Sequence, residues 1–149
     1  MLGLQIANRE FFAPFNPTQD DEFFTLEAQR ARIEDPLRHG WLILDDGDPA
    51  GFVGLSDVKR GALQSAILSY WVDETRNGRG LATRAVGAVA EIAFAELELH
   101  RLEAGTRVDN FGSQRVLEKN GFERFGLARR FLLLGGEWRD HVLFERIAE

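Results

Sequence analysis

The stretch Arg76-Asn77-Gly78-Arg79-Gly80-Leu81-Ala82-Thr83 is the part of the sequence that best indicates how the chain folds. A segment with β character ends just before it at Val72, and a segment with apolar residues at helical spacing follows it. Its two glycines let the backbone turn sharply and approach a ligand without a clash at Cβ. The first N–H groups of the following helix have no partner inside the helix, and with the helix dipole they favour an anion. The sequence therefore predicts a strand, a glycine turn and a helix N-terminus that bind phosphate, with Arg76 and Arg79 adding positive charge.

Other glycine-rich phosphate motifs match this turn less well. A Walker loop requires G-x-x-x-x-G-K-[ST], which the sequence does not contain. A dinucleotide fingerprint needs a third Gly or Ala where this chain has Thr83, and an acidic residue at the end of the next strand. Glu98 stands at about the right distance, but before the next predicted strand. A turn that needs glycine only for its backbone shape stays open as a further interpretation.

The predicted elements on either side of this turn define the fold class. The first quarter of the chain is predicted to be helical with breaks, and Thr25 is the expected N-cap of a helix that Pro36 ends. Turns at Asp46-Gly47 and Gly135-Gly136 predict hairpins, and Gly121 is expected to close a helix as a left-handed C-cap. Strands are predicted at 41–44, 50–58, 64–72, 102–108, 122–134 and 138–147, and helices at 26–34, 80–98 and 113–120. The apolar face of the long helix is predicted to hold Leu81, Ala85, Val89, Ile92, Ala93 and Leu97. This order predicts an α/β (α+β) domain around one sheet.

Length and composition are those of one globular unit. The chain has 149 residues, 44% hydrophobic and 28% charged, which predicts a single domain over residues 1–149. Cysteine is absent, which excludes a disulfide framework and a thiol nucleophile. The net charge of −6 argues against a general nucleic-acid binder, and suits either a cationic partner or plain solubility. No apolar run reaches the ~20 residues of a membrane helix, and the start lacks the basic region of a signal peptide, so a cytoplasmic location is expected.

Ordered blocks of the sequence resemble the GNAT superfamily of N-acetyltransferases, and within it the RimJ/RimL type, the ribosomal-protein-alanine N-acetyltransferases. The glycine turn resembles the [Q/R]-x-x-G-x-[G/A] acetyl-coenzyme A loop of that superfamily, although Asn77 occupies the first position. The other blocks, in family order, lie at 69–72, 78–86, 93–97, 99–104, 110–122 and 138–141. The resemblance implies the GNAT fold, a mixed and mostly antiparallel central sheet with splayed strands flanked by helices. Because the chain starts within what resembles the family's first helix, the usual first N-terminal strand is expected to be missing.

The resemblance implies that acetyl-coenzyme A is the acyl donor. Its pantetheine arm is expected in the gap where the strand ending at Val72 splays from the strand over 102–108, with backbone amides of the turn on the pyrophosphate. The implied donor-binding residues are Trp71, Val72, Asn77, Gly78, Arg79, Gly80, Leu81, Ala82, Thr83, Asn110 and Ser113. No set of His, Asp and Glu residues has metal-ligand spacing, so no metal is expected.

The family's N-x-x-S pattern is matched by Asn110 and Ser113. The resemblance implies that Asn110 contacts the pantetheine, although Asn is also a preferred N-cap and could cap a helix through Ser113. Ser113 is implied to lie near the thioester sulfur and to protonate the leaving thiolate. Glu103 is the candidate general base for the acceptor amine, with Asp73 and Glu74 as alternatives.

Two histidines are bases by chemistry, but structural roles are expected for both. His100 and His141 fall in blocks that resemble structural parts of the family, which favours packing or hydrogen bonding.

The resemblance implies transfer of an acetyl group from acetyl-coenzyme A to a primary amine, such as the N-terminal amine of a ribosomal protein, by direct attack on the thioester. An acetyltransferase for a small amine (an amino acid, a polyamine or an antibiotic) and a non-catalytic acyl-coenzyme A-binding module stay open as alternatives. The expected partner is the amine acceptor, with no nucleic acid and no membrane, and a homodimer stays open.

Overall fold

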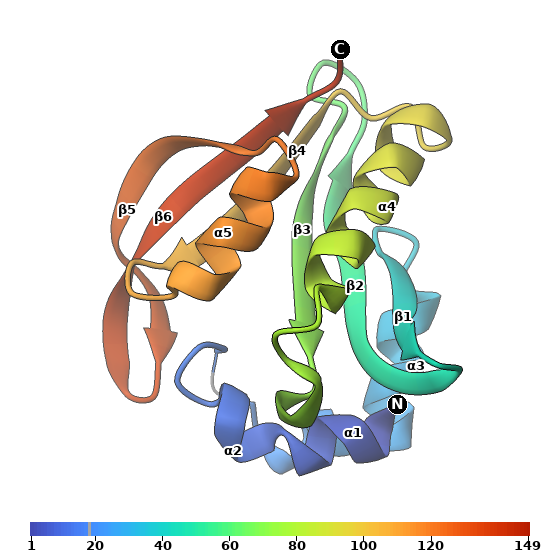
Figure 1. Cartoon of the computed structure of the whole chain (residues 1–149), viewed down its shortest axis with the longest axis vertical. Helices are drawn as coiled ribbons and strands as arrows, with labels where there is room; N and C mark the ends of the chain where they lie inside the picture. Colours follow the sequence, from blue (N-terminus) through green and yellow to red (C-terminus); the bar gives the residue numbers. More distant parts are fainter. Residues whose placement is uncertain (18) are drawn as a thin grey trace.

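The computed structural model describes residues 1–17 and 19–149 and shows a six-stranded sheet flanked by helices (Figure 1). The strands are β1 (His39–Asp45), β2 (Asp48–Lys59), β3 (Ser65–Val72), β4 (Arg101–Arg107), β5 (Glu123–Leu134) and β6 (Glu137–Ile147). They lie in the order β1-β2-β3-β4-β6-β5, with β3 and β4 parallel and the other neighbours antiparallel. The helices are α1 (Leu2–Ala7), α2 (Arg9–Phe12), α3 (Leu26–Glu34), α4 (Leu81–Ala95) and α5 (Phe111–Lys119), with 3-10 turns η1 (Asp21–Phe24) and η2 (Glu74–Arg76). The mixed, mostly antiparallel sheet that was predicted is confirmed.

The core lies between one face of the sheet and the helices α4 and α5 (Figure 1). Successive side chains of a strand point to opposite faces, so alternate residues of each strand reach this layer. Leu68, Leu102 and Phe144 from three strands belong to the same buried cluster as Val86 of α4 and Leu117 of α5. Burial of each such side chain stabilises the fold by roughly 1.5–3 kcal/mol. This packing fixes where α4 begins, and with it the turn that precedes the helix.

The N-terminal helices α1 and α2 cross the end of the sheet at which β3 finishes (Figure 1). Phe12 of α2 packs edge-on against Trp71 of β3, with ring centroids 5.6 Å apart. At the end of β4, Arg107 donates a hydrogen bond of 2.9 Å to the carbonyl oxygen of Pro14, and its guanidinium lies 5.4 Å from the ring centre of Phe15. The end of α2 is therefore tied to β3, and the segment that follows it is tied to the end of β4.

β3 and β4 separate along their length. They pair only where Ser65, Ala66 and Ile67 meet residues 101–103. Beyond this point the strands diverge, as Figure 1 shows, and β3 continues to Val72 with no further partner on β4. The splay that the resemblance implied is confirmed. It leaves backbone groups of both strands facing a gap without a strand partner.

The local turn and cap predictions are confirmed. The hydroxyl of Thr25 caps α3 by accepting a backbone N–H bond of 3.2 Å. Asp46-Gly47 has φ values of 50° and 86°, the positive values that a two-residue hairpin turn requires. Gly121 has φ 77° and closes α5 as a left-handed C-cap. The N–H of the buried Phe122 donates a hydrogen bond to the carbonyl oxygen of Leu117 in the last turn of the helix.

The long helix α4 differs from the prediction in two details. It ends at Ala95 rather than Glu98, which has φ 53° and belongs to the following turn. Leu97 therefore lies beyond the helix. The most buried positions include Val86 and Ala90, which were not in the predicted apolar row. The reason is that α4 contacts β1, β2, β3 and also α5, so its buried stripe is wider than one row.

Before β1, the described residues form only helices and turns. None of the helices in the described part of the chain combines the length and the apolar character needed to cross a membrane.

Candidate active site

The turn between β3 and α4 has the backbone geometry of a phosphate site. Gly78 and Gly80 have φ values of 80° and 76°, in the left-handed region that favours glycine. A Cβ added at either position would have no atom within 4 Å, so the turn faces open space. Gly80 is the N-cap of α4 and supplies no side-chain cap, so the first N–H groups of the helix stay available to a ligand. Converging N–H donors of this kind fit a pyrophosphate.

Both arginines of the turn are paired with one carboxylate, that of Asp45 at the end of β1. Asp45 Oδ2 lies 2.7 Å from Nη1 of Arg79 and 3.6 Å from Nη1 of Arg76. Asp45 therefore offsets part of the positive charge that the sequence predicted beside the phosphate, and a bound phosphate would compete with it. No feature of the sequence indicates a role for Asp45, because nothing distinguishes it among 24 acidic residues.

Asn8 is a second residue that the sequence did not indicate. It is only 2% exposed, and its Nδ2 donates to Oδ1 of Asp73 (3.0 Å) and to the carbonyl oxygen of Leu4 (2.9 Å). Its Oδ1 accepts the N–H of Glu74 at 2.9 Å. Hydrogen bonds from Thr75 and then from Asn8 hold the pKa of Asp73 below its usual range. Asn8 thus supports the start of the glycine turn, and Asp73 is a structural acceptor that is poorly suited to take up a proton near neutral pH.

Tyr70 and Ser113 meet at the open part of the splay. Their hydroxyl oxygens lie 2.6 Å apart, one on β3 and the other in the first turn of α5. Burial raises the pKa of Tyr70 to about 12, against the opposing effect of the Ser113 hydrogen bond. From the sequence, Tyr70 was predicted only to lie in a strand. Its contact with Ser113 could not be predicted, because the two residues are 43 positions apart in the chain. Asn110 caps α5 by accepting the N–H of Ser113 at 3.2 Å, as the capping interpretation proposed.

Glu103, the candidate base, lies at the closed end of the splay. It is in register with Ile67, at the last position where β3 and β4 still pair. Its carboxylate is 2.7 Å from Nε of Arg101, which also pairs with Glu145. By strand alternation it lies on the face of the sheet opposite the core layer that contains Tyr70, the face that also carries Arg107 and His141. Its position at the closed end and its pairing with Arg101 favour a structural ion pair over a base, and Glu74 is exposed in the turn.

The two histidines occupy different environments. His100 is exposed before β4, whereas His141 on β6 is 3% exposed and in register with Arg107, at the open end of β4. Nδ1 of His141 lies 3.0 Å from the carbonyl oxygen of Arg139, and the ring packs edge-on against Phe131 at 5.6 Å. His141 therefore has the packed, hydrogen-bonded position that was expected, whereas the exposed side chain of His100 does not.

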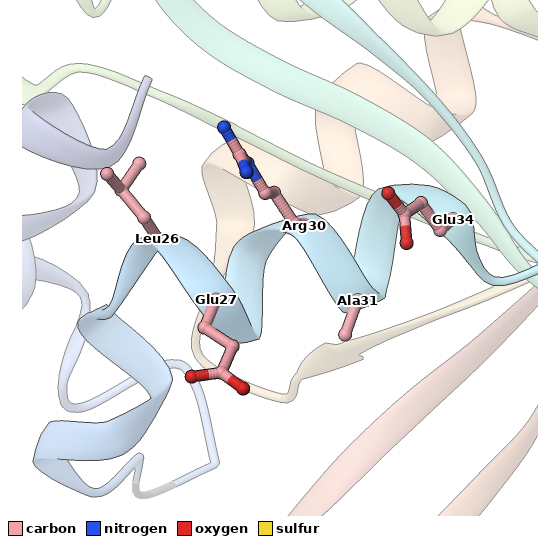
Figure 2. A pocket seen from close by; sticks show the side chains of 5 residues that line it. All are labelled: Leu26, Glu27, Arg30, Ala31 and Glu34. Atoms are coloured by element: carbon pink, nitrogen blue, oxygen red, sulfur yellow. The ribbon is translucent and has the colours of Figure 1, made fainter.

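A shallow hollow along α3 is lined by Leu26, Glu27, Arg30, Ala31 and Glu34 (Figure 2). All of these residues come from one helix, and none belongs to the turn or the splay. The hollow lacks the enclosing walls of a small-molecule site, so we assign no ligand to it. In the described ranges, no group of three or more His, Asp or Glu side chains could hold a metal ion.

Comparison with known proteins agrees with this geometry. Residues 5–123 match the family model described as an acetyltransferase (GNAT) domain. The chain is 42% identical to the probable N-acetyltransferase YjcK of Bacillus subtilis, over 94% of this chain and 82% of that protein. It is 29% identical to the ribosomal protein uS5-alanine N-acetyltransferase of Escherichia coli, over 91% of this chain and 75% of that protein. The structure matches that of Mycobacterium smegmatis RimJ in complex with a CoA-disulfide with a TM-score of 0.89 and 31% identity, covering 99% of this chain and 75% of that one.

Proposed function

The chain belongs to the GNAT acetyltransferase family, and from this premise we propose that it transfers an acetyl group from acetyl-coenzyme A to the N-terminal amine of a protein. The acceptor is supported by the similarity to RimJ and to the uS5-alanine N-acetyltransferase. A ribosomal protein as acceptor would make the cytoplasm the place of the reaction. A small amine is the alternative acceptor for the same donor chemistry.

The donor end of the site fits coenzyme A in shape and charge. The uncapped N-terminus of α4 offers amides to the pyrophosphate, and the splayed strands offer unpaired backbone groups near Trp71 and Val72 to the pantetheine amides. On β4, the hydroxyl of Thr106 is buried and has no hydrogen-bond partner within the described residues. Such an orphaned polar atom beside the gap suits a polar ligand.

The chemistry requires a proton for the leaving thiolate. As the amine nitrogen attacks the thioester carbonyl, a C–N bond forms and the C–S bond breaks. We place Ser113 as the donor of that proton. Tyr70 stays neutral because its pKa is raised to about 12, so its hydroxyl at 2.6 Å can replace the proton that Ser113 gives up.

The observation that carries the proposal is the uncapped start of α4 beside two strands that separate. The test is thiol release from acetyl-coenzyme A with a panel of acceptors: peptides that begin with Ala or Ser, free amino acids and spermidine. We expect the peptides to react with kcat/KM about tenfold or more above the small amines. Failure to bind coenzyme A in calorimetry would reject the donor site, and a preference for spermidine would reject the protein acceptor.

A further inference from the structure

We propose that His141 and Arg139 form the acceptor subsite, in which Nε2 of His141 takes a proton from an α-ammonium group and Nε of Arg139 donates a hydrogen bond to the neighbouring carbonyl oxygen. This inference rests on the proposed function and deepens it. It names the residue that activates the amine, and it makes an α-amino group with an adjacent carbonyl the preferred substrate class.

The hydrogen bond of His141 to the backbone fixes its tautomer. A carbonyl oxygen can only accept, so Nδ1, 3.0 Å from the oxygen of Arg139, must carry the hydrogen. In the neutral ring, Nε2 is then left with a lone pair. Nε2 makes no hydrogen bond to the described residues, although the residue is only 3% exposed. A buried ring with an oriented and unoccupied acceptor nitrogen is the arrangement that a general base requires.

His141 also lies at the required end of the sheet. Its register partner is Arg107, the last residue of β4 and thus the one farthest from the paired end of the splay. Arg107 holds Pro14 and Phe15, so the segment after α2 lies over this corner. The other candidates are occupied: Glu103 by Arg101, and Asp73 by Asn8 and Thr75.

The second half of the subsite is an unsatisfied donor. Nε of Arg139 is buried and has no hydrogen-bond partner within the described part of the chain, while Nη2 of the same side chain pairs with Glu137 at 2.6 Å. A buried N–H without a partner costs about 1–3 kcal/mol, which a ligand carbonyl would recover. Arg139 and His141 are two residues apart on a strand, so both side chains leave the same face. A donor and an acceptor on the same face of one strand match an α-amine and its own carbonyl, and a polyamine has no carbonyl to offer.

The protons balance across the transfer. One proton of the α-ammonium passes to Nε2 of His141 and from there to solvent, which leaves a neutral amine. The amine nitrogen bonds to the thioester carbon and the C–S bond breaks. Of the two protons left on the amine nitrogen, one stays on the new amide and the other is lost to solvent. The leaving thiolate gains one proton from Ser113, so the transfer of the neutral amine is balanced.

The charged groups near His141 come from three strands. On β4, Arg107 pairs with Asp109, and on β6 Arg139 pairs with Glu137. On β5, Arg129 and Arg130 lie in the bulge between the residues that pair with His141 and with Arg139. Asp140 of β6 also belongs to this set, and it accepts the backbone N–H of Arg130 at 2.8 Å.

The first experiment measures kcat/KM for an Ala-peptide between about pH 6 and about pH 9 in the wild type and in His141→Gln, with His100→Gln as the matched control. We expect His141→Gln to be slower by about 100-fold or more at the acid end, with coenzyme A affinity unchanged. The deficit should shrink as pH rises through about 8, where solvent itself deprotonates the α-amine. A deficit that is constant over this range marks a structural role for His141 and overturns the inference, as does full activity of the variant.

The second experiment compares alaninamide with isopropylamine, which has the same skeleton without the carbonyl, at equal concentrations of neutral amine. We expect the wild type to prefer alaninamide by about tenfold or more, because only alaninamide satisfies Nε of Arg139. Arg139→Lys keeps the charge and lacks that N–H, so it should lose most of the preference for alaninamide over isopropylamine. Equal rates with both amines in the wild type would overturn the role of Arg139.

The two proposals fail in different ways. If the wild type binds no acetyl-coenzyme A and acetylates no amine, the proposed function is wrong. If it acetylates peptides while both variants behave as the wild type, the function holds and the acceptor subsite is wrong.

Discussion

The two proposed halves of the site, at the gap between β3 and β4 and on the neighbouring strand β6, use different chemical groups. At the proposed donor end the groups offered to the ligand are backbone amides, exposed by two glycines with positive φ and an uncapped helix. At the proposed acceptor end they are side chains of β6, the strand next to β4, and their setting depends on a strand partner whose register shifts between Ala128 and Leu132. A backbone site tolerates many side chains and fails when a Cβ or a charge enters it. A side-chain site depends on single atoms, so the two ends should respond differently to substitution.

The largest effect is expected from Gly80→Asp at the donor end. The new carboxylate would stand where the pyrophosphate is expected, and coenzyme A affinity should fall by about 100-fold or more. The matched control is Gly61→Asp, because Gly61 also has a positive φ (68°) and open space around it but lies in the turn after β2. Calorimetric titration with coenzyme A checks both variants. Equal affinity in the two would remove the turn from the donor site.

A smaller effect is expected from Ser113→Ala, which removes the proposed proton donor. Turnover should fall by about 10- to 100-fold while coenzyme A affinity stays within about twofold, since the loss falls on the leaving group. Ser69→Ala, on the exposed face of β3, serves as the control. Steady-state thiol release measures kcat, and an undiminished kcat would remove Ser113 from the chemistry.

Asn8→Ala tests whether the donor end needs support from the N-terminal helices. The change leaves Asp73 and the N–H of Glu74 without their partner, which should lower the free energy of unfolding by about 1–3 kcal/mol. Coenzyme A should also bind more weakly, because the turn loses its anchor. Urea unfolding and calorimetry provide the measurements, with the exposed Asn16→Ala as the control. A variant as stable as the wild type would show that the turn supports itself.

The smallest effect is expected from Asp45→Asn, which frees Arg79 and leaves Arg76 with its contact of 3.8 Å to Asp73. Partly exposed ion pairs contribute about 0.2–1 kcal/mol, so coenzyme A should bind about two- to fivefold more tightly at low salt. The gain should shrink as salt is added. Asp46→Asn, at the adjacent exposed turn position, is the control. Weaker binding by Asp45→Asn would mean that Asp45 holds the arginines in place for the ligand rather than competing with it.

Most of the fold and the donor turn could be predicted, because their signals are local. The hairpin turn at Asp46-Gly47, the Thr25 cap and the left-handed Gly121 each depend on the conformation of a few adjacent residues. The splay was implied by the family resemblance and is present. The end of α4 was missed because Glu98 continues the helical pattern in sequence yet belongs to the next turn in the structure.

The candidate site was predicted less completely, and the misses share one cause. Asp45 reaches Arg79 across 34 positions, Tyr70 reaches Ser113 across 43, and Asn8 reaches Asp73 across 65. No periodicity or spacing connects residues at such separations. Glu103 was chosen because its strand borders the gap, but its place along that strand is at the closed end.

The sequence by itself determined the order of the elements, the glycine turn and the family to which the chain belongs. These follow from backbone preferences and from blocks of adjacent residues, which act over a few positions. Only the tertiary structure decided which hydroxyl faces Ser113, which carboxylates are already paired, and which histidine has a free nitrogen at the open end of the gap. Each of these depends on packing between strands that are distant in the chain, and packing sets the burial and the hydrogen-bond partners that make a side chain reactive.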